Sequence, residues 1–171
     1  MDMLSVKIKK IVEILSCDSE TVMKALGIKE TLSFELKMAS TIEKIDEIRN
    51  RIPKGDKLEK KAVQLRNKML REKLNTTKTP KEFMELYQKT EEGSKIEKDC
   101  LRGCLAVCEK DEDFENMFSK IKEGSKMEQD LFKRWLTKCA TPESVKKVFE
   151  KTETGDKNEA AAIRRLAELL P

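Results

Sequence analysis

The chain has 171 residues, of which 40% are charged and only 5% aromatic, and its formal net charge is +4. Gly and Pro are scarce while Lys, Glu, Leu and Met are common, a composition typical of helices that carry many surface ion pairs. An all-β fold is therefore disfavoured. The number of cysteines, five, is odd and three of them stand at helical spacing, which suits reduced thiols better than a disulfide framework.

We do not expect a targeting signal in the N-terminal part of the chain. Residues 1–15 lack the apolar core of a signal peptide, and no run of the chain approaches the roughly 20 apolar residues that span a bilayer. We therefore expect a soluble, cytoplasmic protein that does not associate with membranes. Three short helices are predicted, at about residues 4–15, 19–26 and 29–39, and residues 1–40 are interpreted as a helical cap or a degenerate repeat.

A short motif occurs four times in the rest of the chain. It consists of Gly, then Ser or Asp, then Lys, any residue, and Glu; the last three copies are 31 residues apart and the first lies 38 residues before the second. The glycines are Gly55, Gly93, Gly124 and Gly155, the residues that follow them are Asp56, Ser94, Ser125 and Asp156, and the glutamates are Glu59, Glu97, Glu128 and Glu159. A fixed period of this kind indicates tandem repeats.

The residue types in this motif are those that separate two helices. Gly adopts the left-handed conformation that closes a last helical turn. The following Ser or Asp can accept hydrogen bonds from the first N–H groups of the next helix, and the Glu can reach back to complete a capping box. The motif therefore predicts that one helix ends and another begins within two residues.

Helix start signals stand 14 residues before each glycine. The residues are Thr41, Thr79, Lys110 and Thr141, and Pro80 and Pro142 follow two of them. Thr as the cap with Pro at the first helical position is a common beginning of a helix. Each repeat is thus predicted to be a helical hairpin with a first helix of about 10 residues and a second of about 13. The seven extra residues after Gly55 keep one apolar face, so they should lengthen that second helix by about two turns.

Apolar columns recur at fixed distances from the glycines, and a hairpin with one apolar face must pack on its neighbours to bury it. The predicted fold is all-α: a right-handed stack of helical hairpins with a 31-residue repeat. The predicted divisions are residues 1–40, 41–78, 79–109, 110–140 and 141–171. Residues 41–171 resemble the α-solenoid class, to which tetratricopeptide and HEAT arrays belong. That resemblance implies a curved stack that binds a peptide or a protein surface and performs no chemistry.

Three cysteines lie one helical turn apart, at Cys100, Cys104 and Cys108. They could form a thiolate metal or redox site, or they could fill the core as small apolar side chains. The equivalent positions of the other repeats are mostly apolar, which favours the core, and the spacing matches no standard zinc motif. The sole tryptophan, Trp135, has the same two interpretations, core residue or exposed binding anchor, and its column favours the core. We predict no metal site and no cofactor.

Nothing in the sequence indicates catalysis. Without histidine the chain lacks the commonest general base, and it has no Gly-rich phosphate loop. The repeated glutamates have a structural explanation as capping residues. We therefore predict that the protein is not an enzyme and has no catalytic residues.

The excess of positive charge lies in one segment, since residues 41–78 contain 12 basic and 6 acidic residues. Within the predicted helix 57–74, a stripe of cations lies opposite the apolar face: Lys57, Lys61, Lys68 and Arg71. A solvated helix face is one interpretation and a surface that follows phosphates is the other. No aromatic residue accompanies the stripe, so stacking on bases is not supported.

Two functions fit these observations. The first is a non-catalytic scaffold that binds a protein or peptide through tandem helical hairpins. The alternative is a helical repeat protein that binds nucleic acid through the basic helix. The oligomeric state is not indicated by the sequence.

Overall fold

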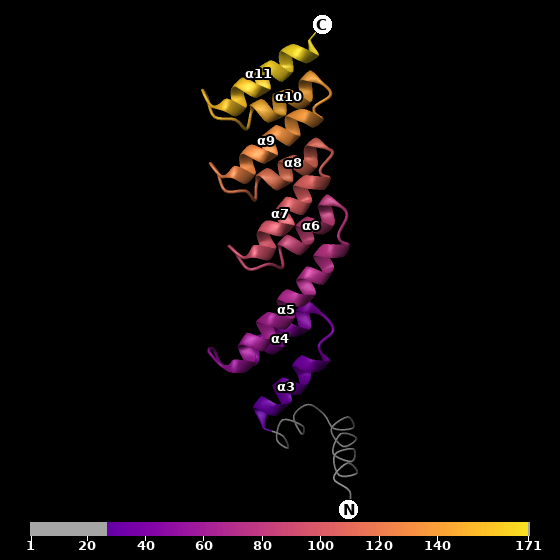
Figure 1. The fold of residues 1–171 in the computed structure, drawn as a ribbon, viewed down its shortest axis with the longest axis vertical. Helices are drawn as coiled ribbons and strands as arrows, with labels where there is room; N and C mark the ends of the chain where they lie inside the picture. The colour runs from indigo at the N-terminus through magenta and orange to yellow at the C-terminus, as the bar shows by residue number, and fades with distance from the viewer. Residues whose placement is uncertain (1–26, 171) are drawn as a thin grey trace, which may run out of the picture. The chain divides into compact units, whose positions relative to one another are not determined.

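The computed structural model describes residues 27–170, and every element of regular secondary structure in that range is an α-helix (Figure 1). The all-α prediction is therefore confirmed for this part of the chain. The described residues divide into two compact units, one up to Leu70 and the other from Arg71, and helix α5 (Lys57–Thr76) contributes residues to both. The predicted helices at residues 4–15 and 19–26 lie outside the described residues.

The first unit contains α3 (Ile28–Met38), α4 (Ile42–Arg51) and the beginning of α5. The third helix predicted near the N-terminus corresponds to α3. Apolar side chains from all three helices form its core: Leu32, Leu36, Ile45, Ile48, Ile52, Leu58 and Ala62. One side of this core is polar, because Arg66 is buried and its Nε donates a hydrogen bond of 2.6 Å to Asp46 Oδ1.

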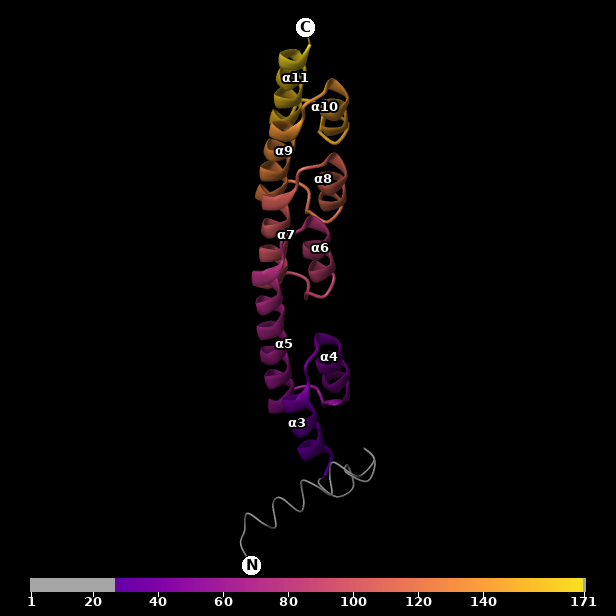
Figure 2. The same ribbon diagram turned by 90° about the vertical axis from the view of Figure 1, so that its right-hand side faces the viewer.

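The second unit contains three helical hairpins. Their helices are α6 (Pro80–Tyr87) with α7 (Lys95–Val107), α8 (Asp111–Phe118) with α9 (Lys126–Lys138), and α10 (Pro142–Phe149) with α11 (Lys157–Leu169). Within this unit the three first helices lie along one side and the three second helices along the other (Figure 2). One continuous core runs through all three hairpins, from Phe83 to Ala162.

The predicted start signals are the observed helix caps. The Oγ1 atoms of Thr41, Thr79 and Thr141 each accept a hydrogen bond from the backbone N–H three residues later, at 3.2–3.3 Å. Pro80 and Pro142 lie in the first turn of their helices, where a missing N–H costs nothing. The sequence prediction of these helix starts is confirmed.

The glycine of each motif has the left-handed backbone, with φ between +70° and +85°. It does not end the first helix, however, and the predicted two-residue connection is wrong. Helix α6 ends at Tyr87, after which the chain makes 3₁₀-type turns, with hydrogen bonds between residues three apart, as far as Thr90. A β-turn then runs from Glu91 to Ser94, closed by the Ser94 N–H and the Glu91 carbonyl, with Gly93 at its third position. A positive φ at that position is what a type II turn requires.

The motif glutamate reaches back further than a standard capping box predicts. The carboxylates of Glu59, Glu97, Glu128 and Glu159 accept hydrogen bonds from the glycine N–H groups, at 2.5–2.7 Å. The N–H of the capping residue is already used in the β-turn, so the next free donor is the glycine. The capping oxygens behave as predicted, since Ser94, Ser125 and Asp156 accept from the N–H of the motif glutamate, and Asp56 accepts from Leu58 N–H.

Helix lengths agree with the repeat. The second helices α7, α9 and α11 each have 13 residues, whereas α5 has 20, so the insertion after Gly55 does lengthen a helix. The first helices of the second unit have 8 residues, two fewer than predicted, because the residues that follow each of them form 3₁₀-type turns.

Arginines connect each second helix to the preceding one in the second unit. Arg134 of α9 donates to the Ala106 carbonyl at the end of α7, at 2.7 Å, and Arg165 of α11 donates to the Cys139 carbonyl that follows α9, at 2.8 Å. Carbonyls in the last turn of a helix have no partner within the helix. The two arginines are 31 residues apart, so equivalent side chains join successive hairpins, although the carbonyls that they reach are 33 residues apart.

Candidate functional site

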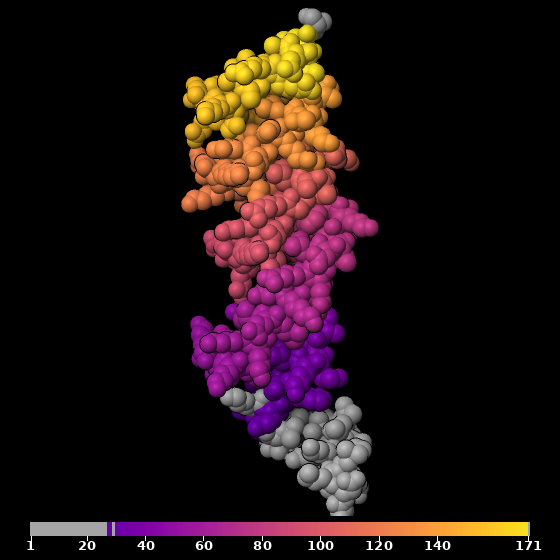
Figure 3. Space-filling model, in the orientation of Figure 1, coloured from indigo at the N-terminus to yellow at the C-terminus, as the bar shows by residue number. Residues whose placement is uncertain are grey.

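Two clefts open between successive hairpins of the second unit, beside the glycine turns. The first lies between the hairpins α6–α7 and α8–α9 and has a volume of about 840 Å³; the second lies between α8–α9 and α10–α11 and has about 760 Å³. In the space-filling view, the turn ends of these hairpins project along one edge of the unit (Figure 3). The clefts therefore lie at the ends of the hairpins that contain the glycine turns.

The two clefts are built from equivalent residues. Subtracting 31 from the number of a second-cleft residue yields a first-cleft residue in every case except Lys122, whose counterpart, Glu91, does not line the first cleft. Ile121 also lines both, so the α8–α9 turn forms a wall that the two clefts share. The repeat thus produces the same hollow twice, side by side.

Apolar side chains form the floor of each cleft. In the first cleft they are Tyr87, Leu101, Ile121 and Met127; in the second they are Phe118, Ile121 and Phe132. Phe118 and Phe132 lie in tilted contact, with ring centroids 5.5 Å apart. These side chains also pack against the continuous core, which holds the floor in place.

Charged side chains form the rims, and the balance of charge differs between the clefts. The first cleft has five cations and three carboxylates, and its cations are Lys98, Arg102, Lys120, Lys122 and Lys126. The second has four carboxylates and two cations, and its carboxylates are Glu123, Glu128, Glu153 and Asp156. The first cleft is therefore basic and the second acidic.

Two carboxylates of the second cleft lie against each other. The contact with Glu123, followed by the charge of Glu123, raises the pKa of Glu153 above its usual value, because two adjacent negative charges repel. The equivalent pair in the first cleft is Glu92 and Lys122, which have opposite charges. The difference comes from one position, where the first cleft has Lys122 and the second has Glu153.

A tyrosine in the first cleft has an altered acidity. Burial, and then the negative charge of Glu97, raises the pKa of Tyr87.

The predicted basic stripe lies on α5. Lys57, Lys61, Lys68 and Arg71 are all exposed on that helix. The three lysines belong to the first unit and Arg71 to the second. None of them lines either cleft, so the stripe and the clefts are separate candidates.

The cysteines of α7 lie in the core. Cys100, Cys104 and Cys108 are each 0% exposed, and Cys139 is 1% exposed. Burial raises the pKa of Cys100 to about 11 and also raises the pKa of Cys139, so these thiols remain protonated and unreactive. The core interpretation of the three cysteines is confirmed.

Trp135 is likewise a core residue. It is 0% exposed and stacks on Phe114, with ring centroids 5.7 Å apart and an interplanar angle of 10°. Its Nε1 donates to Asp111 Oδ1 at 2.8 Å, and the same oxygen accepts from Ser144 Oγ at 2.6 Å. Asp111 therefore connects the hairpin α8–α9 to α10.

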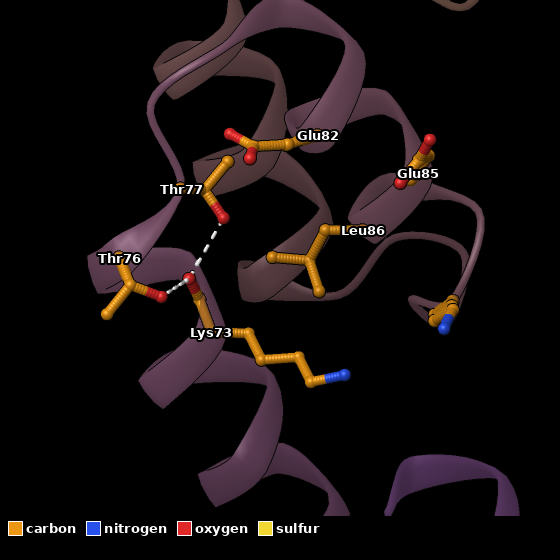
Figure 4. A pocket seen from close by; sticks show the side chains of 7 residues that line it. Lys73, Thr76, Thr77, Glu82, Glu85 and Leu86 are labelled. Carbon is orange, nitrogen blue, oxygen red and sulfur yellow. Dashed lines mark hydrogen bonds between the residues drawn. The ribbon is translucent and has the colours of Figure 1, made fainter.

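A smaller pocket lies at the end of α5, with a volume of about 240 Å³ (Figure 4). Its hydroxyls are engaged in ending the helix, because Thr76 and Thr77 both donate to the Lys73 carbonyl at 2.9 Å. Glu82 accepts from the N–H groups of Lys78 and Thr79, and these bonds lower its pKa. The polar groups here serve local structure, so the pocket is a weaker candidate than the clefts.

The clefts could not be identified from the sequence alone. Tyr87, Phe118, Leu101 and Phe132 belong to regular apolar columns, which predict core residues and do not distinguish a core from the floor of a cleft. Two features of the sequence could have indicated the clefts: the apolar columns, and the change from a positive residue, Lys122, to a negative one, Glu153, at equivalent positions.

Comparison with known proteins leaves the family open. No protein-family model matches the chain, and no curated protein or solved structure matches it. Among residues 27–170, no helix is long and apolar enough to cross a membrane. In the same range no group of three or more Cys, Asp or Glu side chains is arranged to hold a metal ion.

Proposed function

We propose that the protein is a non-catalytic scaffold that binds a peptide or an extended segment of another protein through the clefts of its helical hairpins. The recurrence of one cleft at equivalent positions of successive hairpins supports this proposal. A recess with an apolar floor and a charged rim suits a side chain that is anchored in an otherwise exposed chain. An extended partner can occupy a row of such recesses, as partners do on other repeat proteins.

The architecture in this proposal is the one that the sequence predicts: a right-handed α-solenoid with a 31-residue repeat. Shared turn geometry and the arginine contacts between successive second helices favour it. The divisions at residues 41–78, 79–109, 110–140 and 141–171 remain part of this proposal, as do a cytoplasmic location and the absence of catalysis.

The test is affinity capture from lysate of the source organism, with and without nuclease, using the wild type and two variants. In the cleft variant, Met127→Glu places a charge on the floor of the first cleft. In the stripe variant, Lys57, Lys61, Lys68 and Arg71 are each changed to Glu. We expect a defined set of proteins that survives nuclease, is lost with the cleft variant and is retained by the stripe variant. Retention of all partners by a folded cleft variant would contradict the proposal.

Nucleic-acid binding is the second candidate, because the four cations of the stripe are all exposed on one helix. Contacts to phosphates release counterions, so such binding should weaken steeply between about 50 and 200 mM salt. It should also disappear in the stripe variant. Filter binding of a labelled duplex and of a single strand at both salt concentrations tests it, and binding that is unchanged in the stripe variant would exclude this surface.

A further inference from the structure

We propose that the two clefts act together as a charge-ordered pair that binds one extended peptide, with an acidic stretch in the first cleft and a basic stretch in the second. An apolar side chain next to each stretch would rest on the floor of its cleft. This inference rests on the proposed function, because it specifies the partner of that same site.

The shared wall argues for a single partner. Ile121 and Lys122 line both clefts, so the two hollows are neighbours on one surface of the second unit. A chain that leaves one cleft across the α8–α9 turn enters the other directly. Joining two weak contacts in one chain strengthens binding well beyond either contact alone, because the second contact forms within the complex.

The first cleft is complementary to acidic side chains. Lys98 and Arg102 come from α7, whereas Lys120, Lys122 and Lys126 come from the α8–α9 turn and the start of α9, so cations face the hollow from two hairpins. Among the described residues, no ion pair engages Lys98 or Lys126. A carboxylate of the partner can therefore approach them without displacing a partner within the protein.

The second cleft is complementary to basic side chains. Two of its carboxylates hold the turns, since Glu128 accepts from Gly124 N–H and Asp156 accepts from Glu159 N–H. The other two, Glu123 and Glu153, repel each other at its rim. A Lys or Arg of the partner placed between them would remove this repulsion, which is a favourable contribution that a neutral partner cannot make.

The apolar floors also differ in a way that a partner can distinguish. The second cleft contains the two phenylalanines Phe118 and Phe132, whereas the first contains Tyr87 and Leu101 at the equivalent positions. The two phenylalanines also favour a cation beside them, because the face of an aromatic ring is negative. The floor and the rim of the second cleft thus favour the same class of side chain.

The experiment is selection from a phage-displayed library of random linear peptides of about 16 residues, which reach roughly 50 Å when extended. It uses the full chain as the wild type and two charge-reversal variants. The first-cleft variant carries Lys98→Glu and Lys126→Glu; the second-cleft variant carries Glu123→Lys and Glu153→Lys. All four residues are exposed, so the variants are expected to fold, which circular dichroism checks.

We expect wild-type selections to be enriched in peptides that carry an acidic block and a basic block, each next to an apolar residue. The first-cleft variant should lose the enrichment of the acidic block and keep that of the basic block, and the second-cleft variant should do the reverse. For one synthetic wild-type peptide, each variant should weaken the affinity by at least about tenfold, because a favourable charge contact becomes a repulsive one.

Matched controls separate these effects from a change in total charge. Lys95→Glu with Lys146→Glu changes the net charge as the first-cleft variant does, and Glu112→Lys with Glu143→Lys does so for the second. These four residues are exposed and line neither cleft, so the controls should select the same peptides as the wild type.

Peptides without separated charge blocks, or blocks that persist in both charge-reversal variants, would overturn the inference. If the binding of such peptides were still lost in the Met127→Glu variant, the proposed function would stand without the charge order. If Met127→Glu left the selected peptides unchanged, or if no peptide were enriched, both the inference and the proposed function would be overturned.

Discussion

The hairpin α4–α5 of the first unit and the hairpin α8–α9 of the second fill the same core position with opposite chemistry. Eleven residues after the turn glycine, the first hairpin buries Arg66 and the second buries Trp135. Arg66 binds Asp46 Oδ1 at 2.6 Å, whereas Trp135 stacks on Phe114. The glycine turn is alike in both, with a φ of +84° at Gly55 and +70° at Gly124, whereas the first helices start differently: Thr41 caps α4 through its side chain and Lys110 precedes α8.

This difference indicates that the turn defines the hairpin, while the core position accepts either kind of residue. A large aromatic side chain contributes buried apolar area and dispersion contacts. A buried ion pair contributes little net stability, because desolvation offsets the attraction between the charges, but it strongly disfavours the loss of one partner. The two hairpins should therefore respond differently to truncation of the side chains that fill their cores.

Trp135→Ala should have the largest effect. Removing a fully buried tryptophan leaves a cavity in the continuous core, and we expect a loss of about 3–5 kcal/mol in the free energy of unfolding. Urea titration followed by circular dichroism measures it. Trp135→Phe is the control: it keeps an aromatic ring beside Phe114 and loses the bond to Asp111 and only part of the buried ring volume, so it should cost clearly less. A loss below about 1 kcal/mol for Trp135→Ala would contradict the assigned role of the residue.

Asp46→Ala should have a smaller effect in the first unit. Arg66 would lose the acceptor of its Nε, and since the Asp46 side chain is 38% exposed, water replaces part of that contact. We expect a cost of about 1–3 kcal/mol, measured by the same titration. Adding Arg66→Leu to Asp46→Ala should recover much of the loss, because an apolar residue at this position needs no acceptor. A double variant as unstable as the single one would refute the ion-pair interpretation.

Substitution of the turn glycine should affect both hairpins equally. Gly55→Val and Gly124→Val should each cost more than about 1 kcal/mol, since a branched residue strongly disfavours positive φ. A Cβ atom at either position would have nothing within 4 Å, so the cost is in the backbone alone. Asn tolerates this conformation and should cost less in both places. Thermal melts that differ widely between the two valine variants would show that the turns are not equivalent.

The stability of the α8–α9 hairpin should depend on pH through the ionisation of Asp111. Burial by itself raises the pKa of Asp111, but hydrogen bonds from Ser144 and Trp135 and the charge of Lys147 lower it below its usual value. The ionised form is therefore favoured in the folded state. Its contribution to stability is present above the unfolded pKa of about 3.9 and is lost as the pH falls through the folded pKa.

Asp111→Asn should consequently be less stable than the wild type at neutral pH, and the difference should shrink in acid. Urea titrations at about pH 7 and about pH 3 test this on either side of the usual aspartate pKa. Trp135 is the only tryptophan, so its fluorescence reports on this hairpin. A difference that is the same at both pH values would show that the charge of Asp111 is not involved.

Much of the hairpin geometry was predictable because it depends on residues close in sequence. Thr79 with Pro80 begins a helix and Ser94 begins the next through bonds that span three residues. The end of the first helix was not predictable in the same way. The 3₁₀-type turns before Gly93 contain no residue type that marks the end of a helix. The position of the glycine alone therefore suggested too short a connection between the two helices.

The sequence by itself determined the helical class, the helix starts, the repeat and the left-handed turns, because periodicity and capping are local properties of the chain. Only the tertiary structure decided that Tyr87, Phe118 and Ile121 line clefts, and that Glu153 lies against Glu123. It also decided that Arg66 finds its acceptor 20 residues away in Asp46. Such outcomes depend on which hairpins pack together, and an apolar column or a single charge looks the same in sequence whether its neighbour covers it or leaves it open.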